Sequence, residues 1–573
     1  MNSHDLAQST ARVADVLAED GEQDEHATVD VDVLHMPAGA ANDVPPPSTF
    51  QFLRSLTPFW HDRLIEAGLI LSMGLYYLVG NTHLGLDVGS FLHMPPYLYS
   101  FPFLAIFVYL SWYRLPFAVA LLPLALPYYF MQKTVFSYGS HELNFGLGEI
   151  SVAVCALVAA GQFLLHGKRW RYRLSWAELR QRLGPFSIPI LIFVAAALVS
   201  IVVAVERQTA LRAFREEVFD PLLYVLLVLC CLRTREDLKR LVGALFGSAL
   251  LIAVIGLIQY FLFPIDPQQA TDINRAHAVY GNANSIGLFF DYILPFGMAL
   301  LIWHVDKARR GQDKWWLVVL ILICCVPLIG VLAFSQSLGS ALALPIALLF
   351  ILALSVRNRK TLLIGAGVLL ALGIVGGVAL HRPLTNFIAS WHDNGKGIST
   401  VSKRYYLWLT ALQMIRNHSV FGVGMDNWLC YYSLNNTCPA SHAFNSWYLI
   451  TVKPGTLIST GLSDEPTLSH PHDIFLQIWA SIGLFGLLAF VTILAFFSRL
   501  FVRIVKIIRQ SSHADVRSLE WLVLGVGGAM LAACCQGLID SSFLEQDLAF
   551  CFWGLLAVLL ILRVLTGTPW REK

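Results

Sequence analysis

The sequence predicts an all-α protein: a polytopic membrane bundle of about 14 transmembrane helices (12–14), with one long outer loop that contains an amphipathic helix. Of the 573 residues, 56% are hydrophobic and only 14% are Asp, Glu, Lys or Arg, whereas soluble domains carry about 25% charged residues. The apolar residues gather in runs of about 17–25, the length that crosses a bilayer as a helix. Backbone groups in lipid must be paired within the chain, so helices are expected for these runs.

The composition also limits the class of function. A soluble multidomain enzyme is excluded, because the chain has too little charge to cover a surface that faces water. The near balance of 40 basic and 38 acidic residues is untypical of a protein that binds nucleic acid. We therefore expect contact with membrane lipid and no nucleic-acid partner.

The chain divides into four predicted parts. Residues 1–60 are rich in acidic and poor in aromatic side chains, which predicts a disordered cytoplasmic tail, and they lack the basic start and apolar run of a secretory signal. Residues 61–204 hold a first group of transmembrane helices. Residues 205–565 hold a second group, which includes the outer loop 381–471, and residues 566–573 form a second cytoplasmic tail.

The predicted membrane spans follow one another along the chain. They are 64–81, 95–111, 114–130, 147–166, 186–204, 218–232, 241–263, 283–304, 315–334, 338–356, 361–380, 473–498, 519–539 and 548–565. Run 218–232 is short, and little chain separates 95–111 from 114–130, which is why the expected number extends down to 12.

The distribution of basic residues predicts the orientation. Most of the 40 Lys and Arg residues fall in one alternating set of connections, for example around 168–182, 233–240, 307–314 and 499–517. Cytoplasmic connections carry the excess of Lys and Arg. Both termini are therefore predicted to be cytoplasmic, and the long connection 381–471 is predicted to lie outside.

The ten cysteines agree with this topology. Eight lie in apolar runs, where a thiol behaves as a small hydrophobic group. Cys430 and Cys438 lie in the outer loop, in a compartment where disulfides persist. A Cys430–Cys438 disulfide and a pair of free thiols both remain open, since spacing does not establish geometry.

The outer loop contains a segment with helical periodicity. Apolar side chains recur between Ser402 and Asn417, and Ser402 is the expected N-cap. One interpretation is an interfacial helix that only packs against the bundle. The other is an anion site, because Lys403 and Arg404 place cations beside the free N–H groups of a helix start, where they oppose the helix dipole but attract phosphate.

Three further helices are expected to begin at the outer face with polar residues. The first follows Arg275 and begins near Asn282 and Asn284; the second begins near 335–340. Such residues can simply cap helices. Together with the Arg404 helix they could also line one anion-binding cavity.

The third of these helix starts carries His470, His472 and Asp473, with Gln477 one turn further on. An interfacial polar cluster is one interpretation, and a zinc site is another, although it would need distant ligands as well. Asp291 and Glu149, within or at the ends of apolar runs, are additional candidates because ionisable groups in membranes are often functional.

These segments resemble the O-antigen ligase/polymerase superfamily. Tyr280-Gly281-Asn282-Ala283-Asn284 is similar to its Asn-containing segment, and Ser402–Asn427 is similar to its large outer loop. His470–Gln477, followed by Gly483-Leu484-Phe485-Gly486-Leu487, resembles its signature at the next membrane helix. The resemblance covers about 206–539, with the segments in the same order.

The resemblance implies a function in cell-surface polysaccharide biosynthesis. Such an enzyme joins or polymerises glycans, taking them from a polyprenyl-diphosphate carrier to a hydroxyl of a glycan or lipid acceptor at the outer face of a bacterial cytoplasmic membrane. His472 matches the histidine that acts in transfer and would be the general base. Arg404 matches an arginine associated with the diphosphate, and Arg275 matches a basic residue before the Asn segment.

The sequence departs from the family pattern at two places. Ser337-Leu338-Gly339 lacks an arginine that many members have, for which Lys403 or Arg275 could compensate, and the usual His-Asn is His472-Asp473. No metal or other cofactor is expected, and Asp473 is a candidate to orient His472. The alternative function is a transporter of the same superfamily, either a flippase or an inorganic-carbon transporter; transporters, however, place their sites at the bilayer midplane.

Overall fold

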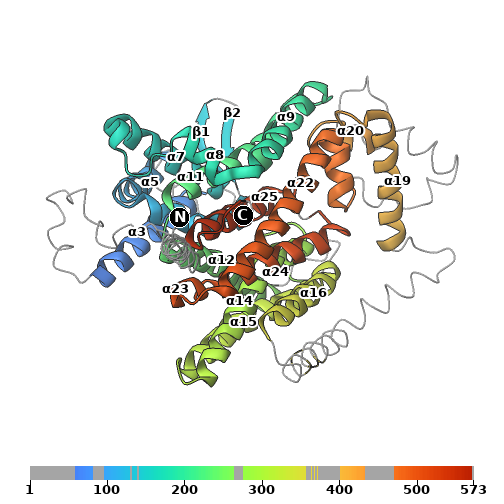
Figure 1. Ribbon diagram of the computed structural model, residues 1–573. Helices are drawn as coiled ribbons and strands as arrows, with labels where there is room; N and C mark the ends of the chain where they lie inside the picture. Colours follow the sequence, from blue (N-terminus) through green and yellow to red (C-terminus); the bar gives the residue numbers. More distant parts are fainter. Residues whose placement is uncertain are drawn as a thin grey trace, which may run out of the picture. The chain divides into compact units, whose positions relative to one another are not determined.

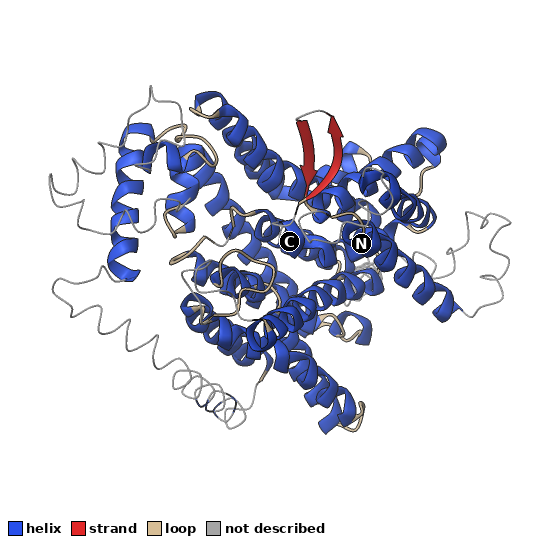
Figure 2. Cartoon of the chain, turned by 180° about the vertical axis from the view of Figure 1, so that it is seen from behind, coloured by secondary structure: helices blue, strands red, loops and turns tan. Residues whose placement is uncertain are grey.

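The computed structural model describes residues 58–81, 96–129, 132–138, 141–263, 275–356, 400–432, 470–541 and 543–570, and a few single positions within 363–371. Nearly all of this chain is helical, and the two strands form one hairpin (Figures 1 and 2). The expected all-α membrane bundle is confirmed. Residues 1–57 of the predicted tail lie outside the described residues. Most of the outer loop 381–471 also lies outside them.

The first group of elements precedes residue 205. Its helices and strands are α3 (Pro58–Leu78), α5 (Pro96–Tyr113), α6 (Leu115–Leu121), η3 (Leu122–Tyr129), β1 (Lys133–Tyr138), β2 (His141–Phe145), α7 (Leu147–His166), η4 (Gly167–Arg169), α8 (Trp176–Leu183), η5 (Gly184–Phe186) and α9 (Ser187–Val203). The antiparallel pair β1–β2 was not predicted from the sequence. It places Lys133 below α3, where the buried ammonium donates to the carbonyls of Tyr76 and Val79 at 2.6 Å, and so satisfies the end of that helix.

The second group follows residue 205. Its elements are α10 (Arg207–Phe214), η6 (Arg215–Phe219), α11 (Asp220–Cys231), α12 (Arg235–Leu262), α13 (Asn284–Asp291), α14 (Leu294–Arg309), α15 (Trp315–Ser335), α16 (Leu338–Ser355), α19 (Thr400–His418), α20 (Trp428–Tyr432), α22 (Ile474–Gln510), α23 (Ala514–Arg517), α24 (Glu520–Gly537) and α25 (Gln546–Leu565). Helix α19 begins two residues before Ser402, so the expectation that Ser402 caps this helix is wrong.

Eight helices within the described residues are long and apolar enough to cross a membrane, or up to ten if each of two bent pairs counts as one span. The expected number of about 14 is therefore not confirmed. The runs 95–111 and 114–130 form one of the bent pairs, with a turn of 118° between its arms, and the run 283–304 forms the other, bent by 45°. The run 361–380 falls largely outside the described residues.

The spans differ in how deeply they are buried. In α24 and α25, 72% and 78% of the span is buried, against 22% in α15 and 28% in the span that contains α9. Glycines of α24 permit its close packing, since a Cβ at Gly525 would collide with Phe296 and one at Gly528 with Ile351. Helices α24 and α25 thus form the centre of the bundle, and α15 and α9 present apolar side chains outward, as a lipid-facing helix does.

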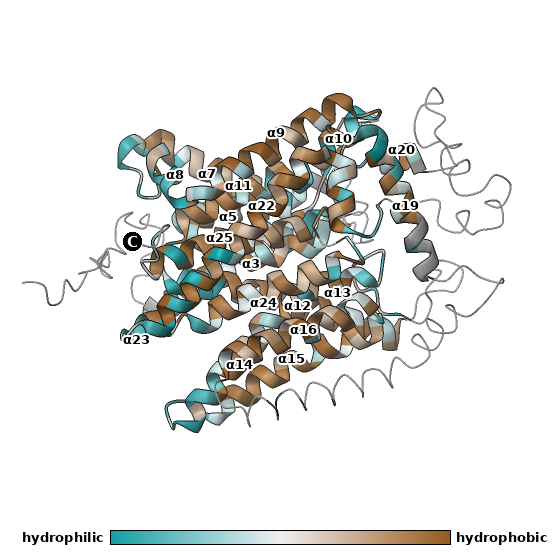
Figure 3. Cartoon of the chain, turned by 45° about the vertical axis from the view of Figure 1, so that its right-hand side comes forward, coloured by the Kyte–Doolittle hydropathy of each residue, from teal (hydrophilic) through white to brown (hydrophobic). Residues whose placement is uncertain are grey.

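The polar residues lie at the ends of the long helices (Figure 3). One end holds the segment 470–473 that leads into α22, the end of α24 and the start of α25. We call it the histidine end. The opposite end holds α8 and α23 and most of the described basic side chains, for example Arg182, Arg235 and Arg509.

Helix α22 is interrupted at Gly483, whose φ of +78° does not belong to a helix. An uninterrupted helix would bond the N–H of residue 484 to the carbonyl of residue 480. Instead Leu484 N donates to Ser419 O at 2.9 Å, and Ala480 O accepts from Val423 N at 2.7 Å. The segment after α19 therefore supplies the backbone partners that the interrupted helix lacks.

Two glycines make this exchange of hydrogen bonds possible. Gly422 has a φ of +73°, and a Cβ there would lie 2.5 Å from the carbonyl oxygen of Ser481; a Cβ at Gly483 would collide with the carbonyl oxygen of Val420. Gly424 N also donates to Ser481 O at 3.0 Å. These contacts hold α19 and α20 against α22, and so bring the 400–432 segment to the histidine end.

We expect Gly483→Ala to lower the free energy of unfolding by about 2 kcal/mol or more, because the alanine meets both an unfavourable backbone conformation and the Val420 carbonyl. The thermal unfolding midpoint of the full chain in detergent measures this. Gly243→Ala in α12 is the matched control, since no atom lies within 4 Å of its added methyl group, and alanine favours a helix interior. Equal midpoints for the two variants would contradict the role of Gly483.

Candidate functional site

The site begins with the segment 470–473, which leads into α22. His472 has a φ of +54°, a left-handed conformation that is uncommon for residues other than glycine and that occurs often at functional sites. Asp473 then caps the helix, because its side chain accepts a hydrogen bond from Leu476 N at 2.8 Å. The cap and the left-handed turn together direct the His472 side chain away from the helix.

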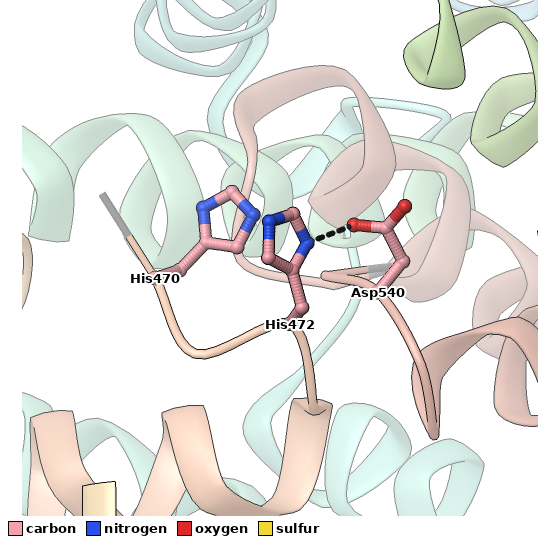
Figure 4. A group of neighbouring side chains, drawn as sticks. All are labelled: His470, His472 and Asp540. Atoms are coloured by element: carbon pink, nitrogen blue, oxygen red, sulfur yellow. Dashed lines mark hydrogen bonds and ion pairs between the residues drawn. The ribbon is translucent and has the colours of Figure 1, made fainter. Parts of the chain in front are cut away.

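His472 contacts Asp540, a residue 68 positions further along the chain. The distance from His472 Nδ1 to Asp540 Oδ1 is 2.7 Å (Figure 4), and Asp540 is only 4% exposed. The expectation that Asp473 orients His472 is therefore wrong: the carboxylate that does so comes from the end of α24, while Asp473 serves the helix start.

Asp540 is ionised at neutral pH. Burial alone would raise the pKa of its carboxyl group, but the charge and hydrogen bond of His472 and the charge of Arg404 outweigh burial and lower the pKa to about 2. The guanidinium of Arg404 lies 4.0 Å from Asp540 Oδ2. The Ser541 backbone N–H also donates to Asp540 Oδ1, at 2.9 Å.

The ionised carboxylate determines the tautomer of His472. A carboxylate has no proton to donate, so Nδ1 of His472 must be the donor, and Nε2 of the neutral ring keeps its lone pair. Figure 4 shows the other edge of this ring turned toward His470. His472 is thus oriented and polarised as a general base is in the His–Asp pair of hydrolases.

His470 is a neutral neighbour of this pair. The rings of His470 and His472 meet edge to face, with centroids 4.6 Å apart. Burial, and then the nearby His472 and Arg404, lower the pKa of His470 to about 3, although Asp540 acts in the opposite direction. A neutral imidazole at this point adds a hydrogen-bonding group without adding charge.

His470, His472 and Asp540 also have the donor types of a metal site. One ligand atom from each lies within 4.8 Å of the others, and two imidazoles with a carboxylate are a known catalytic zinc set. Asp540 replaces Asp473 in the zinc set considered from the sequence. An ion between His472 Nδ1 and Asp540 Oδ1 would replace their hydrogen bond.

Arg275, Asn282 and Asn284 form a separate group. Arg275 donates to Ser335 O at 2.7 Å and to Asn284 Oδ1 at 2.5 Å, and the backbone N–H of Asn284 donates to Asn282 Oδ1 at 2.9 Å. These bonds join the end of α15 to the start of α13, where the Asn282 side chain accepts from the first N–H of the helix. The single cavity expected from the sequence therefore stays a prediction.

The other candidates fall in several places. Gln477 accepts a hydrogen bond from the Ser541 hydroxyl. Glu149 accepts from Gly146 N at 2.7 Å and pairs with Arg215 at 2.8 Å, which indicates a structural role. Asp291 is fully buried in α13.

Three predicted positions concern the 400–438 segment. The Lys403 side chain and Cys438 lie outside the described residues. Cys430 is disulfide-bonded, but the predicted pairing with Cys438 stays a prediction, because that partner is not described.

Asp540 is the residue of the His472 group that sequence reasoning missed. The signal was present, since Asp540 directly follows the apolar run 519–539 and an acidic residue at a membrane boundary is a candidate by default. Its pairing with His472 depends on the packing of α22 against α24, which no local pattern reveals.

The model of the O-antigen ligase family matches residues 319–491. This confirms the resemblance to the O-antigen ligase/polymerase superfamily over a stretch that includes Arg404, His470 and His472. It supports a membrane ligase or polymerase type of function in glycan biosynthesis. No curated protein matches the chain.

We expect protonation of His470 to destabilise the folded chain as the pH falls. Its pKa is about 3 in the folded protein and about 6.5 when unfolded, so the unfolded chain binds the proton first. The contribution of neutral His470 to the free energy of unfolding is fully present above about pH 6.5. Below that pH, the free energy of unfolding falls by at most about 1.4 kcal/mol per pH unit. Unfolding midpoints from pH 7.5 to 4.5 should fall more steeply for the wild type than for His470→Gln; parallel curves would contradict a neutral His470.

Proposed function

We propose that the chain transfers a glycan from a polyprenyl-diphosphate carrier to a hydroxyl of a glycan or lipid acceptor. The observation that carries this proposal is the 2.7 Å contact between His472 and an ionised Asp540. It leaves Nε2 of His472 able to accept a proton, and Arg404 supplies a cation beside the pair. The match to the O-antigen ligase family over 319–491 supports the class of substrate.

The reaction is a displacement at the anomeric carbon of the donor. The acceptor oxygen forms a bond to that carbon as the bond from the carbon to the diphosphate oxygen breaks. The acceptor proton passes to His472 Nε2, and Asp540 stabilises the imidazolium that results. Negative charge grows on the departing diphosphate, where Arg404 offers a guanidinium with five N–H donors.

The histidine end of the bundle would face the outside of a bacterial cytoplasmic membrane. Most described basic side chains lie at the opposite end, around Arg182, Arg235, Lys307 and Arg509. Because cytoplasmic connections carry the excess of Lys and Arg, this distribution supports cytoplasmic termini and an outward-facing site.

We expect His472→Ala to reduce glycan transfer by about 10²–10⁴-fold, because the acceptor hydroxyl loses its general base. Asp540→Asn should produce a loss of similar size. The amide N–H of asparagine can donate to Nδ1 of His472, which places the ring proton on Nε2, so that Nε2 can no longer accept the proton of the acceptor. The measurement is transfer by the purified chain from a polyprenyl-diphosphate glycan to a defined acceptor.

Asp515→Asn, at an exposed carboxylate of the opposite end, is the control for charge loss and should transfer at the wild-type rate. Transfer in the presence of EDTA separates the general base from a metal at the same three side chains. Loss of transfer in EDTA that added Zn²⁺ restores, or full activity of His472→Ala, would refute His472 as the base. Solute uptake into vesicles without any transfer would support the transporter alternative.

We expect Arg404→Ala to raise the concentration of lipid-linked donor needed for half-maximal transfer by about tenfold or more, with a smaller effect on the acceptor, because a bond from a guanidinium to a diphosphate is charge-assisted. Arg416→Ala is the matched control, since Arg416 lies on the same helix and is exposed. Equal changes for donor and acceptor would argue against a diphosphate role.

A further inference from the structure

The connection between α24 and α25 is buried, although most connections between helices run over the surface of a protein. It carries Asp540, and Ser541 and Phe543 follow in the same connection; all three side chains are buried. A buried connection must pair its polar groups within the protein. Its contacts therefore show what holds Asp540 in place beside His472.

Ser541 joins Asp540 to helix α22. The backbone N–H of Ser541 donates to Asp540 Oδ1 at 2.9 Å, and its hydroxyl donates to the side-chain oxygen of Gln477. Gln477 lies in the first turn of α22, where its own N–H donates to Asp473 O at 2.8 Å. Asp540 and His472 are thus linked twice, once by their direct contact and once through Ser541 and Gln477.

The two oxygens of the Asp540 carboxylate have different neighbours. His472 Nδ1 at 2.7 Å and the Ser541 N–H at 2.9 Å both reach Oδ1. Arg404 lies 4.0 Å from Oδ2, which is beyond hydrogen-bond distance. A carboxylate that is free to turn beside a guanidinium forms a closer pair with two hydrogen bonds. The bond from Ser541 therefore keeps the carboxylate directed at His472.

Phe543 is the apolar anchor of the same connection. The centroid of its ring lies 4.9 Å from that of Phe490 in α22 and 4.2 Å from that of Phe552 in α25. Apolar burial is not directional, so these contacts hold the connection against the bundle without setting the rotation of a carboxylate. The directional contact is the hydrogen bond between Ser541 and Gln477.

Gln477 has two candidate roles. The sequence predicts a contact with the substrate. In the folded chain, its side chain is buried and its side-chain oxygen accepts from Ser541, which favours a role within the protein. The two roles predict different kinetics, because loss of a substrate contact changes the half-maximal substrate concentration, whereas misplacement of the base changes the rate.

We propose that Ser541 and Gln477 are positioning residues, whose hydrogen bond holds Asp540 Oδ1 against His472 Nδ1. This inference rests on the proposed transfer and adds the pair that keeps the general base in its reactive orientation. Both residues act through Asp540 and not on the substrate. A misplacement of about 1 Å can cost about 10²-fold in rate, so the loss of this one bond is measurable.

The first test is kinetic. Ser541→Ala should lower the kcat of glycan transfer by about tenfold or more, because Asp540 is no longer held toward His472. The half-maximal concentrations of donor and acceptor should change by less than about twofold, since no substrate contact is removed. Ser541→Thr keeps the hydroxyl and should restore most of the rate. Gln477→Leu removes the same bond from the side of α22 and should resemble Ser541→Ala.

The double variant Ser541→Ala/Gln477→Leu should be no slower than the slower single variant, because both changes remove the same bond. Ser151→Ala is the matched control. It also removes a buried hydroxyl, but that hydroxyl donates to Leu147 O at 2.7 Å within α7. Ser151→Ala should therefore transfer at the wild-type rate.

The second test needs no glycan. Solid-state ¹⁵N NMR of the histidine-labelled full chain in proteoliposomes reports which ring nitrogen carries the proton, and the signals missing from His472→Gln identify His472. We expect the proton on Nδ1 in the wild type and in Ser541→Thr, and a mixture of tautomers in Ser541→Ala. The expected NMR results in a wild type that transfers no glycan would refute the proposed reaction and still support the positioning role.

Three results would overturn the positioning role. The first is Ser541→Ala with the kcat and the His472 signals of the wild type. The second is a double variant in which the two single losses multiply. The third is Gln477→Leu with an unchanged kcat and a raised half-maximal donor or acceptor concentration, which would make Gln477 a substrate contact. Unfolding midpoints above the assay temperature confirm that the variants are folded.

Discussion

The exchange of backbone hydrogen bonds at Gly483 is the constraint on which the site depends. An interrupted membrane helix leaves N–H and C=O groups that lipid cannot satisfy. Here the groups of Ala480, Ser481 and Leu484 pair with the turn that follows α19. The energetic need to pair them fixes where that turn lies, and with it the helix that carries Arg404 and the residues Asp426 and Trp428.

A second consequence is the arrangement of charge around His472. Asp540 is buried but not isolated, because His472 and Arg404 hold its carboxylate in the ionised form. Glu217 is buried without such partners, since Arg212 of α10 and Arg215 of η6 are already paired with Glu216 and Glu149. Asp540 is thus a satisfied carboxylate that orients His472, whereas Glu217 makes no hydrogen bond or ion pair among the described residues.

The sequence predicted much of this site but misassigned its internal contacts. His470, His472 and Arg404 lie together as expected, because they occur at helix starts on one side of the membrane. The role given to Asp473 belongs to Asp540, since adjacent residues on a helix start cannot face each other while one of them caps the helix. Asn282, Asn284 and Arg275 bond to one another and to the end of α15.

By itself, the sequence determined the membrane class, the helical spans and the end of the bundle that holds the chemistry. These follow from hydropathy, length and the distribution of Lys and Arg, which act locally along the chain. Only the tertiary structure decided that Asp540 meets His472 and that Ser541 meets Gln477. Those pairs join residues 68 and 64 positions apart, and such contacts depend on how helices pack and on which backbone groups remain to be paired, not on any periodicity within a segment.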